Sequence, residues 1–183
     1  MIPITDHDPA APAPGAARGA TRSTASGTTS GTTSDGPGAP PTPGAARDPA
    51  TLLRRLGRHV PFGTDRVLVG VVRLSRGYVE RAGWCAATTA PVPAADLHAA
   101  VMACLAPLAP PRPAIPPTHA VAMVRCRRGR VVWLPTDDAW VSALVAEAGR
   151  RRLPVVETFL LTEHGWRCRT GTAAGSVPAL DRP

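Results

Sequence analysis

Four arginines crowd one short stretch of the chain, in a pattern suited to anion binding. Arg125, Arg127, Arg128 and Arg130 follow an apolar run and precede Trp133. A guanidinium group is planar and permanently charged, so a cluster of them can bind phosphate or carboxylate through paired hydrogen bonds. Trp133 adds a flat ring on which a nucleic-acid base could stack. The stretch therefore predicts an anion-binding surface, with an ordinary solvated loop as the alternative.

The four cysteines are widely spaced and form no Cys-x-x-Cys pair, which argues against zinc-ribbon and redox motifs; they are Cys85, Cys104, Cys126 and Cys168. Cys126 lies between two arginines, and flanking cations favour a thiolate. If it lies on a strand, however, side-chain alternation turns it away from both, and we expect a buried, inert thiol. The sequence opens without the charged and apolar pattern of a signal peptide, so no signal peptide is expected, and free thiols in a reducing cytoplasm are the expectation.

The charge of the chain is strongly uneven. All 21 basic residues are arginines, and only three of them fall within residues 1–48, against four aspartates. The other 135 residues carry 18 arginines against nine acidic residues. This excess of positive charge favours an acidic partner, either a protein or a nucleic acid. No apolar run is long enough to span a membrane, so no membrane partner is expected.

Composition divides the chain into three parts. Residues 1–47 contain almost only Ala, Pro, Gly, Ser and Thr, and we expect a disordered leader because such a segment cannot bury enough apolar area to offset its chain entropy. Residues 48–171 carry the periodic apolar patterns of one domain, and residues 172–183 are expected to fray. Residues 108–117 hold five prolines and must form a loop, whose position relative to the expected cleft the sequence leaves open.

Within the domain, strands alternate with helices. Asp48-Pro49 begins a helix that ends near Gly57, and Thr136 is the expected cap of the last helix. The remaining expected elements are strands over 66–74, 78–88, 118–124, 155–162 and 166–170, and helices over 93–105 and 136–152. After the first short helix the order is β-β-α-β-α-β-β. It predicts an α/β fold with a single mixed sheet and flanking helices.

Three local patterns make residues 65–170 similar to the RadC-like branch of the JAB/MPN domains. These are Leu74-Ser75-Arg76-Gly77, then Pro91-Val92 with Asp96-Leu97, and then Pro135-Thr136 with Leu144-Val145 and Leu153-Pro154-Val155-Val156-Glu157. The resemblance implies a cytidine-deaminase-like three-layer architecture. In active members it also implies a zinc ion held by a His-x-His pair, an aspartate in Ser-x-x-Asp and a water, with an upstream glutamate as general base.

This chain departs from that zinc site at several positions. The His-x-His positions are Arg125 and Arg127, and the best match to the Ser-x-x-Asp pattern is Thr136 with Asp138, which is one residue too short. Arginine has no lone pair to give to a metal. No glutamate precedes Glu80, which follows the expected hairpin turn. We therefore expect no catalytic residue, no zinc and no other cofactor.

The sequence favours a catalytically inactive JAB/RadC-like module that binds an acidic protein or nucleic acid through the arginine cluster. Two alternatives stay open. One is a zinc metallopeptidase or isopeptidase of the same family with rearranged ligands, the only case in which zinc is expected. The other is a non-specific nucleic-acid binder linked to DNA metabolism, which would recognise the phosphate backbone.

Overall fold

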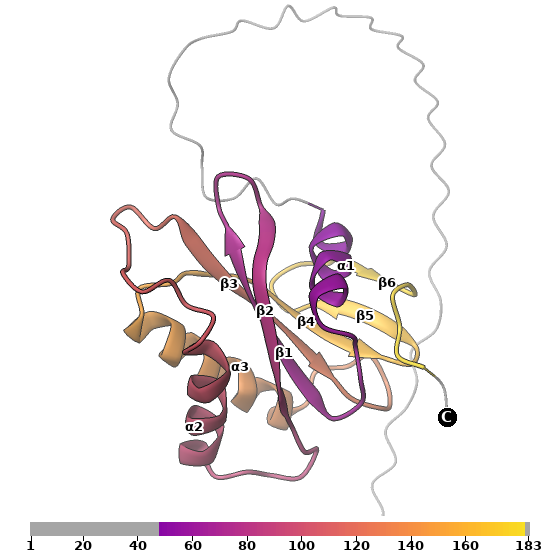
Figure 1. Ribbon diagram of the computed structural model, residues 1–183. Helices are drawn as coiled ribbons and strands as arrows, with labels where there is room; N and C mark the ends of the chain where they lie inside the picture. Colours follow the sequence, from indigo (N-terminus) through magenta and orange to yellow (C-terminus); the bar gives the residue numbers. More distant parts are fainter. Residues whose placement is uncertain (1–47, 182–183) are drawn as a thin grey trace, which may run out of the picture. The chain divides into compact units, whose positions relative to one another are not determined.

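A computed structural model describes residues 48–181, which form one six-stranded sheet with three helices (Figure 1). Its elements in chain order are α1 (Pro49–His59), β1 (Arg66–Arg73), β2 (Tyr78–Ala86), α2 (Ala94–Leu105), β3 (His119–Cys126), α3 (Pro135–Arg150), β4 (Val155–Thr162), β5 (Gly165–Cys168) and β6 (Ala174–Gly175). The predicted α/β class with a single mixed sheet and flanking helices is confirmed. The expected leader, residues 1–47, lies outside the described residues.

The strand order across the sheet is β2-β1-β3-β4-β5-β6. β1 pairs antiparallel with both β2 and β3, and β4 and β5 also pair antiparallel. Only β3 and β4 are parallel, joined by the crossover through α3. Because β1 begins opposite the end of β3, Arg66 and Cys126 are register partners. The loop that follows β3 therefore leaves the sheet beside the start of β1.

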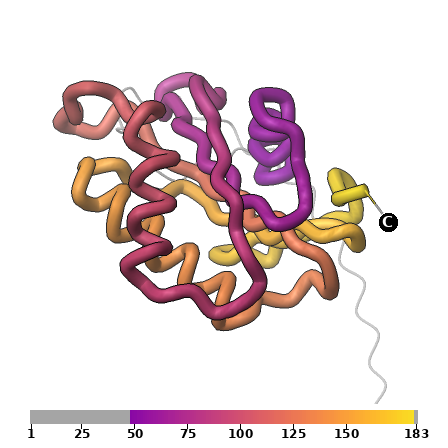
Figure 2. Tube along the Cα trace, turned by 60° about the horizontal axis from the view of Figure 1, so that its bottom comes forward, coloured from indigo at the N-terminus to yellow at the C-terminus, as the bar shows by residue number. Residues whose placement is uncertain are grey.

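Helices cover both faces of the sheet, α2 and α3 one face and α1 the other (Figure 2). Alternation along β1 sends Val67 and Val69 into the core beneath α2 and α3, and Leu68 into the core beneath α1. β3 alternates in the same way, with Met123 on the first face and Val124 on the second. The central strands are buried on both faces, as their unbroken apolar runs require.

The starts of the helices follow capping chemistry, with one correction. The Asp48 carboxylate accepts hydrogen bonds from the backbone N–H groups of Ala50 and Thr51, so this predicted cap of α1 is confirmed. The predicted cap of α3 was wrong, because Leu134 and not Thr136 is its N-cap residue. Asp137, three positions on, accepts the Leu134 N–H at 3.0 Å and closes the first turn.

Several predicted boundaries shift. In particular, α1 continues past Gly57 to His59, and β3 continues past Val124 to Cys126. The second shift matters most, because it places Arg125 inside the sheet instead of in a loop. β1 supplies one ladder partner for Arg125 and β4 supplies the other, so its backbone is fixed on both sides.

The end of the chain was expected to fray from residue 172, and over residues 172–181 this was wrong. β6 pairs with β5, and the Trp166 indole N–H donates to the Val177 carbonyl at 2.9 Å. The Leu180 side chain is buried in the core beneath α1, and its N–H donates to the Thr162 carbonyl. A buried apolar side chain so close to the end of the chain holds the segment against the sheet.

Candidate functional site

The arginines at the end of β3 meet an aspartate at the start of α3. Arg127 Nε donates to both carboxylate oxygens of Asp137, at 3.1 and 3.0 Å. Arg125 Nε lies 3.4 Å from Asp137 Oδ1 as an ion pair, without the geometry of a hydrogen bond. Both arginines stand on the face of β3 that α3 covers, because they lie two residues apart. Arg125, Arg127 and Asp137 are called the arginine–aspartate cluster below.

Backbone carbonyls bind the remaining nitrogens of Arg125. Its Nη2 donates to the Thr88 carbonyl at 2.9 Å, and its Nη1 donates to the Cys126 and Arg66 carbonyls at 3.2 and 3.5 Å. The side chain is fully buried. Arg125 thereby joins three segments of chain, namely the start of β1, the end of β3 and the segment after β2.

Arg127 organises the loop after β3 in the same way. Its Nη1 donates to the carbonyls of Arg128 and Arg130, at 3.0 and 3.4 Å, and its Nη2 donates to the Val132 carbonyl at 2.5 Å. With Nε on Asp137, each nitrogen of this guanidinium has an acceptor. Arg127 is only 4% exposed, so it supports the loop from beneath.

The cluster carries two positive charges against one negative charge in a site without water contact. Burial lowers the pKa of Arg125, and the charge of Asp137 opposes that shift. Such an arrangement is tolerated because the carboxylate and the carbonyl dipoles compensate the guanidinium groups. Removing one member would leave an unpaired charge in a low-dielectric region.

The predicted anion-binding surface is therefore corrected for two of its four arginines. Arg125 and Arg127 cannot reach an external anion, because both are buried and both pair with Asp137 within the chain. A groove at the start of α3, about 260 Å³, is mostly apolar, and no arginine is among its lining residues. Its lining residues are Ala90, Pro91, Val92, Leu97, Pro135, Thr136, Ala139 and Trp140.

The other two arginines of the stretch are exposed on the loop after β3. Arg128 and Arg130 flank Gly129, whose φ of +101° suits a residue without a side chain. The Gly129 N–H donates to both carboxylate oxygens of Glu163, at 3.0 and 3.1 Å. The loop is thus fixed from two sides, by Arg127 and by the β4–β5 turn, while its guanidinium groups face solvent.

Trp133 and Asp138 belong to a separate surface contact. The Arg169 guanidinium lies 5.5 Å from the centre of the Trp133 ring, and it also pairs with the Asp138 carboxylate. Trp133 is half-buried, so Arg169 takes one of its faces and the predicted stacking surface is only partly open. Asp138 and Thr136 do not join the cluster; Asp138 is exposed and Thr136 lines the apolar groove.

Cys126 points away from both flanking arginines, into the core beneath α1. Burial raises the pKa of its thiol to about 12, which keeps it protonated and unreactive at neutral pH. The expected burial of this thiol is confirmed, and the raised pKa supports the expectation that it is inert.

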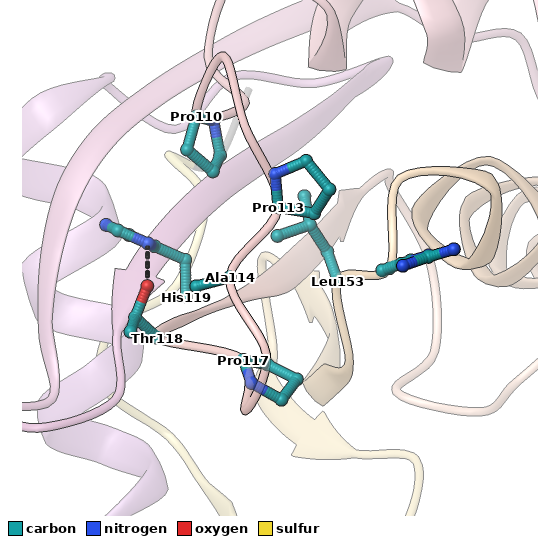
Figure 3. A pocket seen from close by; sticks show the side chains of 8 residues that line it. Pro110, Pro113, Ala114, Pro117, Thr118, His119 and Leu153 are labelled. Atoms are coloured by element: carbon teal, nitrogen blue, oxygen red, sulfur yellow. Dashed lines mark hydrogen bonds between the residues drawn. The ribbon is translucent and has the colours of Figure 1, made fainter.

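The proline-rich loop lies at the opposite end of β3 from the cluster. Pro110, Pro113 and Pro117 gather around Leu153 and the start of β3 (Figure 3). There the Thr118 hydroxyl and His119 Nδ1 are 2.9 Å apart, and His119 Nε2 lies 2.8 Å from Glu80. Glu80 is thus engaged at this end of the sheet, and the loop does not cover the arginine–aspartate cluster.

The cluster does not fit a zinc ion. Its two guanidinium groups offer no lone pair, and they would repel a divalent cation. Both oxygens of the Asp137 carboxylate already accept hydrogen bonds, from Arg127 and from the Leu134 N–H. Within residues 48–181, no group of three or more His, Cys, Asp or Glu side chains could hold a metal ion.

Sequence reasoning missed Asp137 as the acidic member of this site. The signal was available, because Pro135 is typical of the first helical position and places Asp137 at the third, where an acidic side chain reaches back to the N-cap. Counting from Leu134 instead of Thr136 gives the three-residue spacing to an aspartate that the Ser-x-x-Asp pattern requires.

Comparison with known proteins adds no relative. No protein-family model matches the chain, and neither the curated proteins nor the solved structures give a match. Among the described residues, no helix is both long and apolar enough to cross a membrane.

Proposed function

We propose that residues 48–181 form a RadC-like domain of the JAB/MPN class in which the arginine–aspartate cluster takes the place of the zinc centre. The convergence of Arg125, Arg127 and Asp137 carries this proposal. Two strand positions spaced as His-x-His meet a carboxylate at the third position of the next helix, as the resemblance requires of zinc ligands. Here the guanidinium groups supply the positive charge opposite the carboxylate, and the chain has no use for a metal or another cofactor.

Such a domain is a binding module and not an enzyme. It retains no ligand set for a catalytic ion, and the cluster joins α3 to the sheet as a structural ion pair. The general-base position also lacks a candidate, since Glu80 binds His119 at the other end of β3. The four cysteines are free thiols, which accords with the proposed location in the cytoplasm.

The proposed partner is acidic, and Arg128 and Arg130 are the proposed contacts. Both are exposed, and a loop with fixed backbone presents them. Preorganisation of this kind reduces the entropy lost on binding.

The test compares two double variants that remove equal charge. Arg128→Ala with Arg130→Ala removes the proposed contacts, and Arg76→Ala with Arg112→Ala removes two exposed arginines at the opposite end of the sheet. Binding to labelled single-stranded DNA, duplex DNA and polyglutamate is measured across salt. If DNA is the ligand class, the first pair should lower the slope of log affinity against log salt by about 1.8, from about 0.9 for each lost phosphate contact.

The control pair should change affinity much less. Equal losses from both pairs would show diffuse attraction to a basic protein, and the proposed surface would be wrong. Binding of polyglutamate without DNA would identify a protein partner, and the reverse would favour a nucleic-acid binder. Stoichiometric zinc in the purified chain, measured by elemental analysis, would overturn the metal-free proposal.

A further inference from the structure

Two cysteines far apart in the sequence face one another between β2 and α2. Cys104 is buried in the core beneath α2 and α3, and Cys85 packs against the same core from β2. Each thiol shifts the pKa of the other. A Cβ added at Gly83, two residues before Cys85 and on the same face of β2, would lie 3.6 Å from Cys104 Sγ, at ordinary van der Waals distance. The Cys104 sulfur therefore packs directly over the stretch of β2 that carries Cys85.

The two thiols differ in exposure and in acidity. Cys85 is half-buried on the edge strand β2, whereas Cys104 is 8% exposed. The hydrogen bond from Cys104 lowers the pKa of Cys85, and the nearby charge of Arg125 lowers it further, against the effect of burial. The same hydrogen bond, together with burial, raises the pKa of Cys104.

The strand pairing in the sheet explains why the charge of Arg125 lowers the pKa of Cys85. Val67 is the register partner of Cys85 on one side and of Arg125 on the other. Residues that are paired in this way point to the same face of a sheet. The arginine–aspartate cluster is therefore a fixed source of positive charge on the face that carries the thiol pair.

We propose that Cys85 and Cys104 form a peroxide-reactive dithiol, in which Cys85 is oxidised first and Cys104 then closes a disulfide between β2 and α2. The edge position of Cys85 gives a small oxidant access, and the Cys104 thiol, packed over the same stretch of β2, is placed to resolve the product. This chemistry is independent of the proposed binding function.

The reaction balances with hydrogen peroxide as the oxidant. The Cys85 thiolate attacks one peroxide oxygen, so an S–O bond forms, the O–O bond breaks, and hydroxide leaves. The sulfur is oxidised by two electrons to a sulfenic acid. Cys104, giving its proton to the hydroxide, then attacks the Cys85 sulfur; the S–S bond forms, the S–O bond breaks, and the second oxygen leaves as hydroxide, which takes up the proton that the Cys85 thiol released to solvent when it ionised.

The other two cysteines provide an internal contrast. Cys126 and Cys168 are buried in the core beneath α1, on the opposite face of the sheet. Burial raises the pKa of each thiol to about 12, helped at Cys168 by the negative charge of Glu157. Both are expected to stay reduced under the conditions that oxidise the pair.

The experiment treats the full chain with hydrogen peroxide, quenches it, denatures it and alkylates the free thiols with iodoacetamide. Intact mass should show two alkyl groups fewer than in the untreated chain, and dithiothreitol should restore both. Cys168→Ser is the matched control and should still lose the same two thiols. Cys85→Ser should lose none at that dose, whereas Cys104→Ser should accumulate a sulfenic acid at Cys85 that dimedone labels.

Three results would overturn the proposal. The first is loss of no thiol in the wild-type chain at a dose that oxidises the free thiol of an exposed model peptide. The second is a disulfide that persists in Cys85→Ser or Cys104→Ser. The third is a disulfide that joins two chains, visible on a non-reducing gel. Thermal unfolding of each variant, and the substitution Cys104→Ala, separate loss of chemistry from loss of the fold.

Discussion

Arg127 Nε and the Asp137 carboxylate join the end of β3 to the first turn of α3 through two hydrogen bonds, at 3.1 and 3.0 Å. Asp137 serves two purposes there, since it also caps the backbone of its own helix. The carboxylate is fully buried, and so is the guanidinium of Arg125 at 3.4 Å. Helix, strand and following loop therefore share one electrostatic anchor.

Removing the charge of Asp137 should destabilise the fold strongly. Asp137→Asn leaves two buried guanidinium groups without their anion, and we expect a loss of about 3–5 kcal/mol in the free energy of unfolding. Asp138→Asn is the matched control, because its carboxylate is exposed and should contribute about 0–1 kcal/mol. Urea unfolding of both variants measures the difference. Similar, small losses would mean that the cluster does not hold α3 to the sheet.

The fold and the site differ in how far the sequence predicts them. Apolar periodicity and the Asp48 cap predict the helices and strands, because burial depends on side-chain type at regular spacing. Whether Arg125 is exposed in a loop or buried in the sheet depends instead on where β3 ends. Because β3 continues two residues beyond the predicted end, Arg125 is buried. No local pattern shows that Cys104 meets Cys85, because their contact depends on how α2 packs on β2.

A pair of histidines should turn the cluster into a metal site. Arg125→His with Arg127→His places two imidazoles toward Asp137, the ligand types that zinc prefers. We expect this variant to bind stoichiometric zinc and to gain thermal stability when zinc is added, whereas the wild-type chain gains none. Elemental analysis and thermal unfolding with and without zinc measure both effects.

Two controls make that result specific. Arg128→His with Arg130→His adds two histidines on the exposed loop and should not create a stable site. Adding Asp137→Asn to the first pair should abolish the zinc effect. If the variant with Arg125→His and Arg127→His folds but binds no zinc, that result would count against the proposal that the cluster takes the place of a zinc centre.

The loop that presents Arg128 and Arg130 should loosen in acid. The hydrogen bond from the Gly129 N–H holds the pKa of Glu163 below its ordinary value of 4.5, with smaller help from nearby His164 and Arg128. A carboxyl whose pKa is lowered by folding stabilises the native loop above its unfolded pKa, and that stabilisation is lost as the pH falls through the folded pKa. Exchange of the Gly129 amide hydrogen should accelerate in that acidic range relative to a loop without the carboxylate. Glu163→Gln should remove most of this pH dependence, and an unchanged profile in that variant would rule out Glu163 as the anchor.

The segment that carries Leu180 should contribute to the free energy of unfolding of the domain. Leu180 is 6% exposed and packs in the core beneath α1, so Leu180→Ala should lower the free energy of unfolding by about 2–5 kcal/mol through lost burial and a cavity. Val177→Ala is the control, because that side chain is 76% exposed while its carbonyl still accepts the Trp166 indole N–H. Denaturant unfolding followed by tryptophan fluorescence suits both variants, since Trp166 lies in the same core. If Leu180→Ala proved as mild as Val177→Ala, the end of the chain would not be part of the cooperative fold. A large loss would instead extend the domain ten residues beyond the boundary at residue 171.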